Sequence, residues 1–478
     1  MRRSLAVSGG QPRRCAAWRI TGASLLAPRG HAPLAGLLLC CLVADAGAQV
    51  TILGGKLDDQ ARALASDAAG NLYVLGETRS GDIDFRYLLA DGQKRGFLAK
   101  INRQGKLDWV MLVSDPISHD FGGEVVAFND NLLISGLDGI SAGSWSGGDL
   151  SRFDLDGKSR WRHRLLMPPR GLNLLLAVDR GGDLFTTGWY PGSAMAPQSM
   201  SLDVVRRGSA VFKGGIMLSK LSKDGGRSWA HVLANDSRVT ARGIATAPNG
   251  QIVICGEYTG APTLGGVRLQ QAVSGGFAMA LDGNGRPVWT TTWVSPSRGL
   301  SVSGGVATRP NEIYVSGTYL HGVKLGATNL LSAGASVYVA RIDAGQVTWA
   351  VSSVGNGLVW PLRLLLQPGE RLLLPGTYVG GLRVGRHATP AGAPRGLFVA
   401  SIDPAGKWLG LHSASIRGGD VELGGAALDR RGALHLAGSF APGARLGCTL
   451  LRSNGARDVF IWHVQRRQRG RGRQAVRR

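Results

Sequence analysis

The sequence is poor in cysteine, in acidic residues and in long apolar runs. Five of its 478 residues are cysteines, and three of these precede residue 42, so a fold stabilised by many disulfides is excluded. The apolar run Pro33–Val43 is shorter than the ~18 residues of a membrane-spanning helix, and no transmembrane segment is expected. Neither the zinc-binding helix motif of metalloproteases nor the phosphate-binding P-loop occurs.

Charge is scarce and unevenly distributed. Charged residues make up 18% of the chain against 44% hydrophobic residues, a balance that excludes a largely disordered protein. The 55 basic and 32 acidic residues give a net charge of +23, of which residues 1–48 contribute +5, residues 465–478 contribute +7 and the remainder +11. The basic excess predicts contact with anionic surfaces or polymers.

Glycine, by contrast, is abundant, and seven of the 72 copies mark an internal repeat. Each of the seven ends a β-forming run such as Asn71–Gly76 or Gln251–Gly256, and successive copies lie 52 to 68 residues apart. They are Gly76, Gly136, Gly188, Gly256, Gly317, Gly376 and Gly438. This period predicts an all-β protein, a seven-bladed β-propeller of four-stranded antiparallel blades around one axis.

Each repeat divides into four strands, which we label a to d from the axis outward. Strand a carries a small residue in six copies, because inner strands converge at the axis. These residues are Ala65, Ala127, Ala177, Ala245, Ala307 and Ala427, with Leu365 in the remaining copy. Strand d carries a Trp four residues past a turn Gly in five copies, which predicts packing between blades at the rim. These are Trp109, Trp161, Trp229, Trp289 and Trp349, whereas Trp408 follows Gly406 by two residues.

The two ends of the repeat region complement each other. The last repeat ends with its strand c at Val459–Val464 and has no strand d of its own. A lone β-forming segment, Val50–Leu53, precedes the first repeat. We predict that this N-terminal segment completes the seventh blade as its outer strand and so closes the ring.

The termini are expected to lie outside the propeller. Residues 1–32 carry six Arg and no acid, the apolar run follows, and Ala46-Gly47-Ala48 fits a signal-peptidase site. We predict a signal peptide over residues 1–48, the propeller over 49–464 and a disordered Arg-rich tail over 465–478. The protein is then exported, to the periplasm, the cell surface or the medium.

Two segments carry a resemblance to known repeats. Residues 243–258 and 277–289 resemble the SBBP-type β-propeller repeats of bacterial exported and cell-surface proteins, a likeness that extends over about residues 49–464 and implies a fold but no shared catalytic motif. Ser222–Trp229 is similar to the Asp-box turn of sialidase-type propellers. A more general similarity, in the turn-Gly and Trp rhythm, is to quinoprotein-like propellers and outer-membrane assembly lipoproteins.

The clearest candidate for a binding surface follows strand b. The second residue after the repeat Gly is aromatic in five copies, and the first is acidic in two. These residues are Glu77, Tyr190, Glu257, Tyr258, Tyr319, Tyr378 and Phe440. On one face of the ring they would form an aromatic and acidic surface able to stack on sugars or hold a peptide. The alternative is that each ring packs between blades.

No metal site or cofactor is predicted. The eight His outside the signal peptide lack metal-ligand spacing, and His435, in a strand b, is expected to be a buried core residue. Asp154–Gly157 and Asp282–Gly285 resemble calcium loops but lack the final bidentate Glu, so we interpret them as hairpin turns. Cys255 and Cys448 fall in different repeats, and a disulfide between them is not expected.

Three functions fit these patterns. The first is a monomeric, non-catalytic binding or scaffold module for a glycan, a peptide or an anionic envelope polymer, held by the propeller face and the Arg-rich tail. The second is a carbohydrate-active enzyme, for which Glu77, Glu124, Glu257 and Glu422 are the candidate carboxylates. The third is an envelope-assembly factor. Because no catalytic constellation is evident, the first function is preferred.

Overall fold

A computed structural model describes residues 49–82, 92–114, 123–137, 148–165, 175–191, 214–234 and 236–464. The chain divides into two units, Met1–Val43 and Ala44–Arg478, and every described residue belongs to the second. The predicted signal peptide and Arg-rich tail lie outside the described residues. All the regular elements in the described part are strands, and it holds no helix able to cross a membrane.

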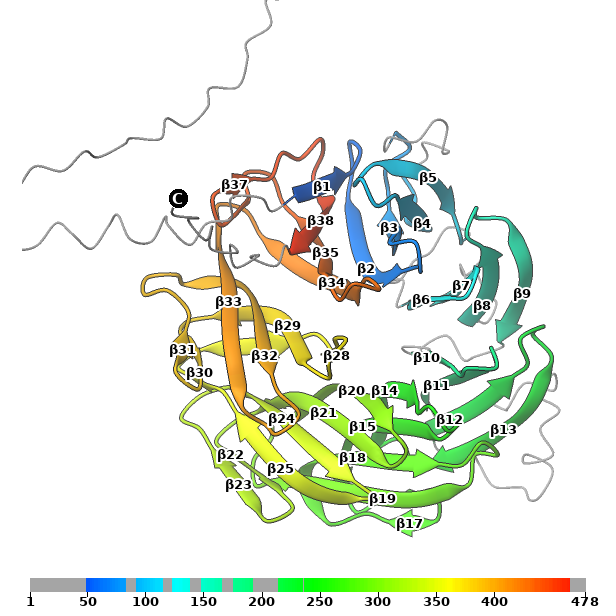
Figure 1. Cartoon of the computed structure of the whole chain (residues 1–478), viewed down its shortest axis with the longest axis vertical. Coiled ribbons are helices and arrows are strands. Elements are labelled where there is room, and N and C mark those ends of the chain that lie inside the picture. The colour runs from blue at the N-terminus through cyan, green and yellow to red at the C-terminus, as the bar shows by residue number, and fades with distance from the viewer. Residues whose placement is uncertain are drawn as a thin grey trace, which may run out of the picture. The chain divides into compact units, whose positions relative to one another are not determined.

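Seven four-stranded antiparallel blades surround a central axis, as the glycine repeat predicts (Figure 1). The first three blades are, from strand a to strand d, β2 (Asp59–Ser66), β3 (Leu72–Thr78), β4 (Arg95–Ile101) and β5 (Leu107–Leu112); β6 (Val125–Phe128), β7 (Asn131–Leu137), β8 (Gly148–Asp154) and β9 (Ser159–Leu165); β10 (Leu175–Val178), β11 (Leu184–Pro191), β12 (Gly214–Leu221) and β13 (Arg227–Ala234). In each blade strand a lies nearest the middle of the ring.

The remaining blades follow the same order. Blade 4 is β14 (Val239–Thr246), β15 (Ile252–Gly260), β18 (Ala272–Leu281) and β19 (Pro287–Ser295); blade 5 is β20 (Ser301–Arg309), β21 (Glu312–Tyr319), β24 (Ser336–Asp343) and β25 (Gln346–Ser352). Blade 6 has an inner strand in two pieces, β27 (Leu358–Pro361) and β28 (Leu365–Leu366), followed by β29 (Leu372–Val379), β32 (Arg395–Ile402) and β33 (Trp408–Arg417). Blade 7 is β34 (Val421–Leu428), β35 (Leu434–Phe440), β38 (Asp458–Val464) and β1 (Gln49–Leu53).

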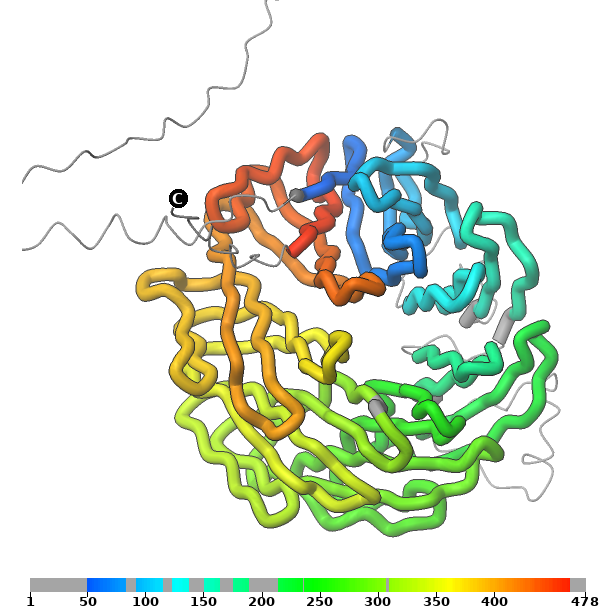
Figure 2. Tube along the Cα trace, in the orientation of Figure 1, coloured from blue at the N-terminus to red at the C-terminus, as the bar shows by residue number. Residues whose placement is uncertain are grey.

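The ring closes through its N-terminal strand, which confirms the prediction from the two ends of the repeat region. β1 pairs with β38 antiparallel over five residues, from Gln49 opposite His463 to Leu53 opposite Val459. Figure 2 shows the blue start of the described chain lying in the red last blade. Asp59 at the start of β2 also donates its N–H to the carbonyl of Arg457, 2.8 Å away. The first and last blades are thus joined by backbone hydrogen bonds.

Short hairpins between strands b and c reach back to the preceding blade. They are β16 (Thr263–Leu264) with β17 (Val267–Arg268), β22 (Gly322–Leu325) with β23 (Thr328–Leu331), β30 (Leu382–Val384) with β31 (His387–Ala388), and β36 (Arg445–Leu446) with β37 (Thr449–Leu450). β22 pairs with β19, β36 pairs with β33, and β30 pairs with β26 (Val354–Gly355), which follows β25. Three of these hairpins therefore pair with a strand of the preceding blade or of the segment that follows it, and the fourth is held by the Gly265 N–H, which donates to the carbonyl of Leu233 in β13 at 2.7 Å.

The repeat Gly is required by close packing on two sides. A Cβ on Gly256 would lie 2.0 Å from the carbonyl oxygen of Thr240 in strand a and 2.8 Å from the ring of Phe277 in strand c. Phe277 is the cross-strand partner of Gly256, and the same arrangement pairs Gly438 with Phe460. The aromatic ring of strand c covers the bare backbone of strand b, so that the two residues fill one volume.

Glycines in strand a allow adjacent inner strands to approach closely. A Cβ on Gly243 would lie 3.1 Å from the Cα of Gly304 in the next blade, and one on Gly424 would lie 2.0 Å from the carbonyl oxygen of Ala61. This agrees with the small residues predicted for the axis. In blades 1, 4, 5 and 7 the pairing of strands a and b also shifts by one residue, a β-bulge that leaves one residue of strand a without a partner in the ladder.

The rim Trp residues pack on the next blade, as predicted. A Cβ on Gly406, in the turn between strands c and d of blade 6, would lie 2.9 Å from the ring of Trp349 in blade 5, and the Trp349 indole N–H donates to the carbonyl of Pro404 at 3.1 Å. Trp109 faces the turn at Gly157 in the same way. Each indole thus covers a turn Gly that has a positive φ, at +87° for Gly406 and +83° for Gly157.

The two calcium-like segments are hairpin turns, as interpreted from the sequence. The Asp154 carboxylate accepts the N–H groups of Asp156 and Lys158, and that of Asp282 accepts those of Asn284 and Arg286. The carboxylate oxygen is therefore used inside its own turn. Cys255 and Cys448 are free thiols, the first buried and the second exposed.

A pair of His residues, His435 buried and His463 partly buried, joins strands b and c of blade 7. His435 in β35 and His463 in β38 are cross-strand partners whose Nδ1 atoms lie 3.0 Å apart, and Asp429 Oδ2 lies 3.9 Å from His435 Nε2. Burial, with a smaller contribution from His463, lowers the pKa of His435 from 6.5 to about 4, and burial also lowers the pKa of His463. The core position predicted for His435 is confirmed.

We expect this pair to make the fold sensitive to acid. The unfolded chain binds more protons than the folded chain between pH 6.5 and about 4, so the pair lowers the free energy of unfolding as the pH falls through that range, by on the order of 2 kcal/mol at pH 5. Asp59, whose pKa burial raises to about 6, acts in the opposite direction. Thermal melts at pH 7.5 and 5 should therefore compare the native chain with His435→Gln/His463→Gln, whose melting temperature should fall less. An equal fall would contradict the expectation.

Candidate functional site

The aromatic residues predicted as a binding surface lie inside the blades. The exposed fractions of Tyr258, Tyr319 and Tyr378 are 2%, 0% and 1%, and that of Phe440 is 0%. Burial raises the pKa of each of the three Tyr hydroxyls. Tyr190 lies in β11, but its side chain falls outside the described residues.

Packing explains the recurrence of these rings. A Cβ on Gly275 in strand c of blade 4 would lie 2.4 Å from the ring of Tyr258, and a Cβ on Gly396 in blade 6 would lie 2.8 Å from that of Tyr378. The ring after the repeat Gly therefore covers a second glycine on strand c. The four described rings support the packing alternative and present no free aromatic surface to a ligand.

The two acidic residues of the predicted surface hold blades and strands together. Glu257 accepts the N–H of Val302 at 2.8 Å and the hydroxyl of Ser301 at 3.0 Å, both at the start of the next blade, and pairs with Arg242 at 3.3 Å. Glu77, 2% exposed, pairs with Arg62 at 2.9 Å and Lys94 at 3.1 Å. Their carboxylates are therefore already neutralised by neighbouring cations.

The bulge in strand a supplies the cations. Arg62 and Arg242 are the bulged residues of β2 and β14, and each turns toward the Glu that follows the repeat Gly of its own blade. A bulge redirects one side chain without disturbing the rest of the ladder. The Arg–Glu pairs thus lie at the end of the ring where strands a begin and strands b end, which we call the axial face.

An ion pair between blades 6 and 2 crosses the axis of the ring. Arg363, between the two pieces of the inner strand of blade 6, lies 3.9 Å from the Oε1 of Glu124, which precedes β6 of blade 2. Arg363 also donates to the carbonyl of Ala426 in blade 7, and Glu124 accepts the N–H of Leu176 in blade 3 at 2.7 Å. Four blades are therefore linked across the axis.

Glu124 is buried among the inner strands, and its surroundings change its pKa. Burial raises its pKa, and Arg363 and the Leu176 N–H only partly offset this. The fourth candidate, Glu422, pairs with Arg457 at 3.2 Å. All four predicted carboxylates are thus ion-paired, which suits holding a structure or a ligand better than the proton transfers of glycoside cleavage, where one carboxyl acts as acid and another as base or nucleophile.

Sequence reasoning missed the arginines and one exposed Trp. Arg363 stands two residues before Leu365, where the other copies carry uncharged residues. These are Ala63, Val125, Leu175, Gly243, Gly305 and Gly425. Trp360 in β27 is 52% exposed and lies outside the turn-Gly and Trp rhythm of the rim. Departure from the repeat pattern is the signal that could have identified both residues.

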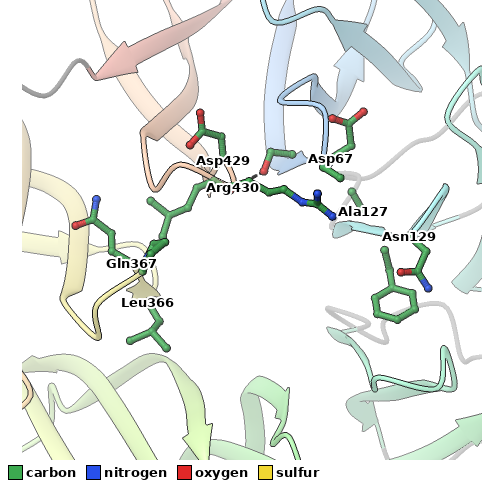
Figure 3. Close-up of a pocket in the computed structure, with 12 residues that line it drawn as sticks. Asp67, Ala127, Asn129, Leu366, Gln367, Asp429 and Arg430 are labelled. Carbon is green, nitrogen blue, oxygen red and sulfur yellow. Dashed lines mark hydrogen bonds between the residues drawn. The ribbon is translucent and has the colours of Figure 1, made fainter.

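The opposite end of the ring holds a pocket of about 500 Å³. It lies among the turns between strands a and b of blades 1, 2, 6 and 7, and Figure 3 shows Arg430 extended across it toward Ala127. Both carboxylates that line the pocket accept hydrogen bonds from neighbouring residues. Asp67 accepts from the Asn71 N–H and the Tyr73 hydroxyl, and Asp429 accepts from the backbone N–H groups of its own turn. The pocket therefore offers shape and one exposed guanidinium but no free carboxylate pair.

The described part of the chain contains no cluster of side chains that could bind a metal ion. No three His, Cys, Asp or Glu side chains gather there as metal ligands would.

Comparisons with known proteins concern the fold. No family model and no curated protein matches the chain. A protein of unknown function from Dyadobacter fermentans is 10% identical, with 88% of this chain and 100% of that chain covered and a TM-score of 0.44. An ulvan lyase of a new polysaccharide lyase family is 10% identical, over 85% of this chain and 97% of that chain, with a TM-score of 0.44. The endosialidase of phage phi92 is 7% identical, over 88% and 70%, with a TM-score of 0.40. At these values the likeness carries no information on activity.

Proposed function

We propose that this chain is an exported, SBBP-type propeller that binds a polysaccharide on its axial face without cleaving it. The observation that carries the proposal is the pairing of Glu77, Glu124, Glu257 and Glu422 with Arg, since a cationic partner favours the ionised carboxylate over the protonated general acid that glycoside cleavage requires. The excess of basic residues over 49–464 and the Arg-rich tail favour acidic polysaccharides, whose affinity should fall as salt rises.

A carbohydrate-active enzyme is the second candidate, because burial raises the pKa of Glu124 and so favours the protonated form that a general acid requires. The two candidates are separated by a glycan array followed by a reducing-sugar assay on every glycan bound. We expect binding with no release of reducing ends. Glu124→Gln, which keeps the shape of the side chain, should bind the same glycans.

Turnover that disappears in Glu124→Gln would replace the binding proposal with the enzyme. The matched control is Glu370→Gln, which removes an exposed carboxylate paired with Arg309 away from the axial face. Turnover should be equal in this control and in the native chain whichever candidate is right. Absence of binding to any glycan would contradict both candidates.

A further inference from the structure

Blade 6 differs from blades 1, 4, 5 and 7 at the start of its inner strand. In the antiparallel pairing of strands a and b, one position of strand a lies opposite the residue after the repeat Gly. That position is Gln60 in blade 1, Thr240 in blade 4, Ser301 in blade 5, Trp360 in blade 6 and Glu422 in blade 7. Four blades therefore present a polar residue where blade 6 presents an indole.

The same exception recurs two residues earlier along strand a. The residues there are Asp58, Arg238, Gly299 and Asp420 in blades 1, 4, 5 and 7, and Leu358 in blade 6. Residues two apart on a strand share a face, so Leu358 and Trp360 point the same way. Val379 lies directly opposite Leu358 on β29 and shares that face.

These three side chains form an exposed apolar surface, which we call the blade 6 platform. The exposed fractions of Leu358, Trp360 and Val379 are 51%, 52% and 43%. Strand residues that pack between blades are buried here, as Val359 is at 4%, so exposure of this one face is not explained by the packing of the fold. A contiguous apolar group that faces water in this way is a candidate ligand surface.

Polar groups border the platform. Arg395 lies opposite Val379 on β32 and pairs with Asp420 at 2.6 Å, and the Asp420 side chain is 68% exposed. A guanidinium and a carboxylate therefore lie at the Val379 side of the platform, with β29 between the strand of Arg395 and that of Trp360. The C–H groups on one face of a pyranose ring stack on an indole, while its hydroxyl groups donate to a carboxylate and accept from a guanidinium.

We infer that the blade 6 platform is the contact surface for the pyranose rings of a polysaccharide, with Trp360 as the stacking residue and Arg395 and Asp420 as hydrogen-bonding partners of its hydroxyls. The inference rests on the proposed binding function and gives it a location. A second protein chain fits less well, because three half-exposed side chains present on the order of 300 Å², against about 800 Å² per partner in a stable protein interface.

The test is affinity electrophoresis of the full chain through native gels that contain a soluble β-glucan, a xylan or polygalacturonate. We expect at least one of these to retard the native protein. Trp360→Ala should weaken that binding at least tenfold, and Trp360→Phe, which keeps an aromatic face, should retain most of it. Asp420→Asn should weaken it less than Trp360→Ala.

Leu331→Ala is the matched control, because Leu331 in β23 is 82% exposed on the hairpin of blade 5, away from the platform. It should bind as the native chain does. Leu358→Ser provides a second change on the platform that leaves Trp360 in place, should Trp360→Ala lower the melting temperature. It should also weaken retardation.

The outcomes separate the two levels of the proposal. If the native chain is retarded and both Trp360→Ala and Leu358→Ser are retarded equally, the platform inference is overturned while polysaccharide binding stands. If none of the polysaccharides retards the native chain in the gel and no glycan on the array binds it, the proposed function itself is overturned.

Discussion

Removing residues 49–53 should lower the free energy of unfolding by about 5 kcal/mol and make the protein aggregate. The deletion removes the core residue Leu53 and the apolar contacts that Val50 and Ile52 make in blade 7, and each of these side chains contributes about 1.5–3 kcal/mol when buried. It also leaves β38 as an unpaired edge, which is a template for pairing between chains. Denaturant unfolding and light scattering measure the two effects.

A synthetic peptide of residues 49–55 provides the control for this deletion. Added in excess, it should pair with β38, raise the melting temperature of the truncated chain and suppress scattering, since binding to the folded state alone stabilises it. Removing residues 465–478, which follow the last strand, should leave the melting temperature unchanged. An unchanged melting temperature after loss of residues 49–53 would refute closure by the N-terminal strand.

Gly256→Ala should lower the free energy of unfolding by about 3 kcal/mol, at the upper end of the usual cost of overpacking. The new methyl group would lie 2.0 Å from the carbonyl oxygen of Thr240 and 2.8 Å from the ring of Phe277, and the backbone oxygen cannot move without breaking the ladder between β14 and β15. Denaturant unfolding at pH 7.5 gives the difference directly.

Gly250→Ala is the matched change in the same blade. Gly250 has a φ of +83° and nothing within 4 Å of an added Cβ, so only the backbone conformation is strained, at about 1–2 kcal/mol. Phe277→Leu combined with Gly256→Ala should recover part of the lost free energy of unfolding, because Leu leaves room for the new methyl group where the Phe277 ring lies. Equal effects of Gly256→Ala and Gly250→Ala would show that the repeat Gly is not selected by packing.

The fold was predictable because its constraints repeat. The Gly opposite Phe277, the Gly opposite Phe460 and the rim indoles recur in blade after blade, so each local requirement appears many times in one sequence. Closure was predictable because the last repeat lacks a strand d and a lone β-forming segment precedes the first repeat. Both inferences use distances along the chain alone.

The candidate site was less predictable, because both faces of strand b are buried. The alternation of side chains along that strand therefore does not show which residues reach the surface. Strand b lies between strands a and c and between two blades, and all seven residues of β3 are buried. The aromatic positions at Tyr258 and Tyr378 therefore look like a surface in the sequence while they cover Gly275 and Gly396 in the structure. The contact between Arg363 and Glu124 joins blades 6 and 2, and the spacing of residues along the chain does not predict it.

The number of blades, the small residues at the axis, the rim packing and the closing strand follow from the repeat period and from side-chain size, so the order of residues is enough to predict them. Exposure to water is set only when the ring closes. In the closed ring Tyr258 lies inside its blade, Trp360 faces water, and Arg363 meets Glu124 across the axis. Side-chain exposure depends on how neighbouring blades meet, and spacing along the chain does not encode that contact.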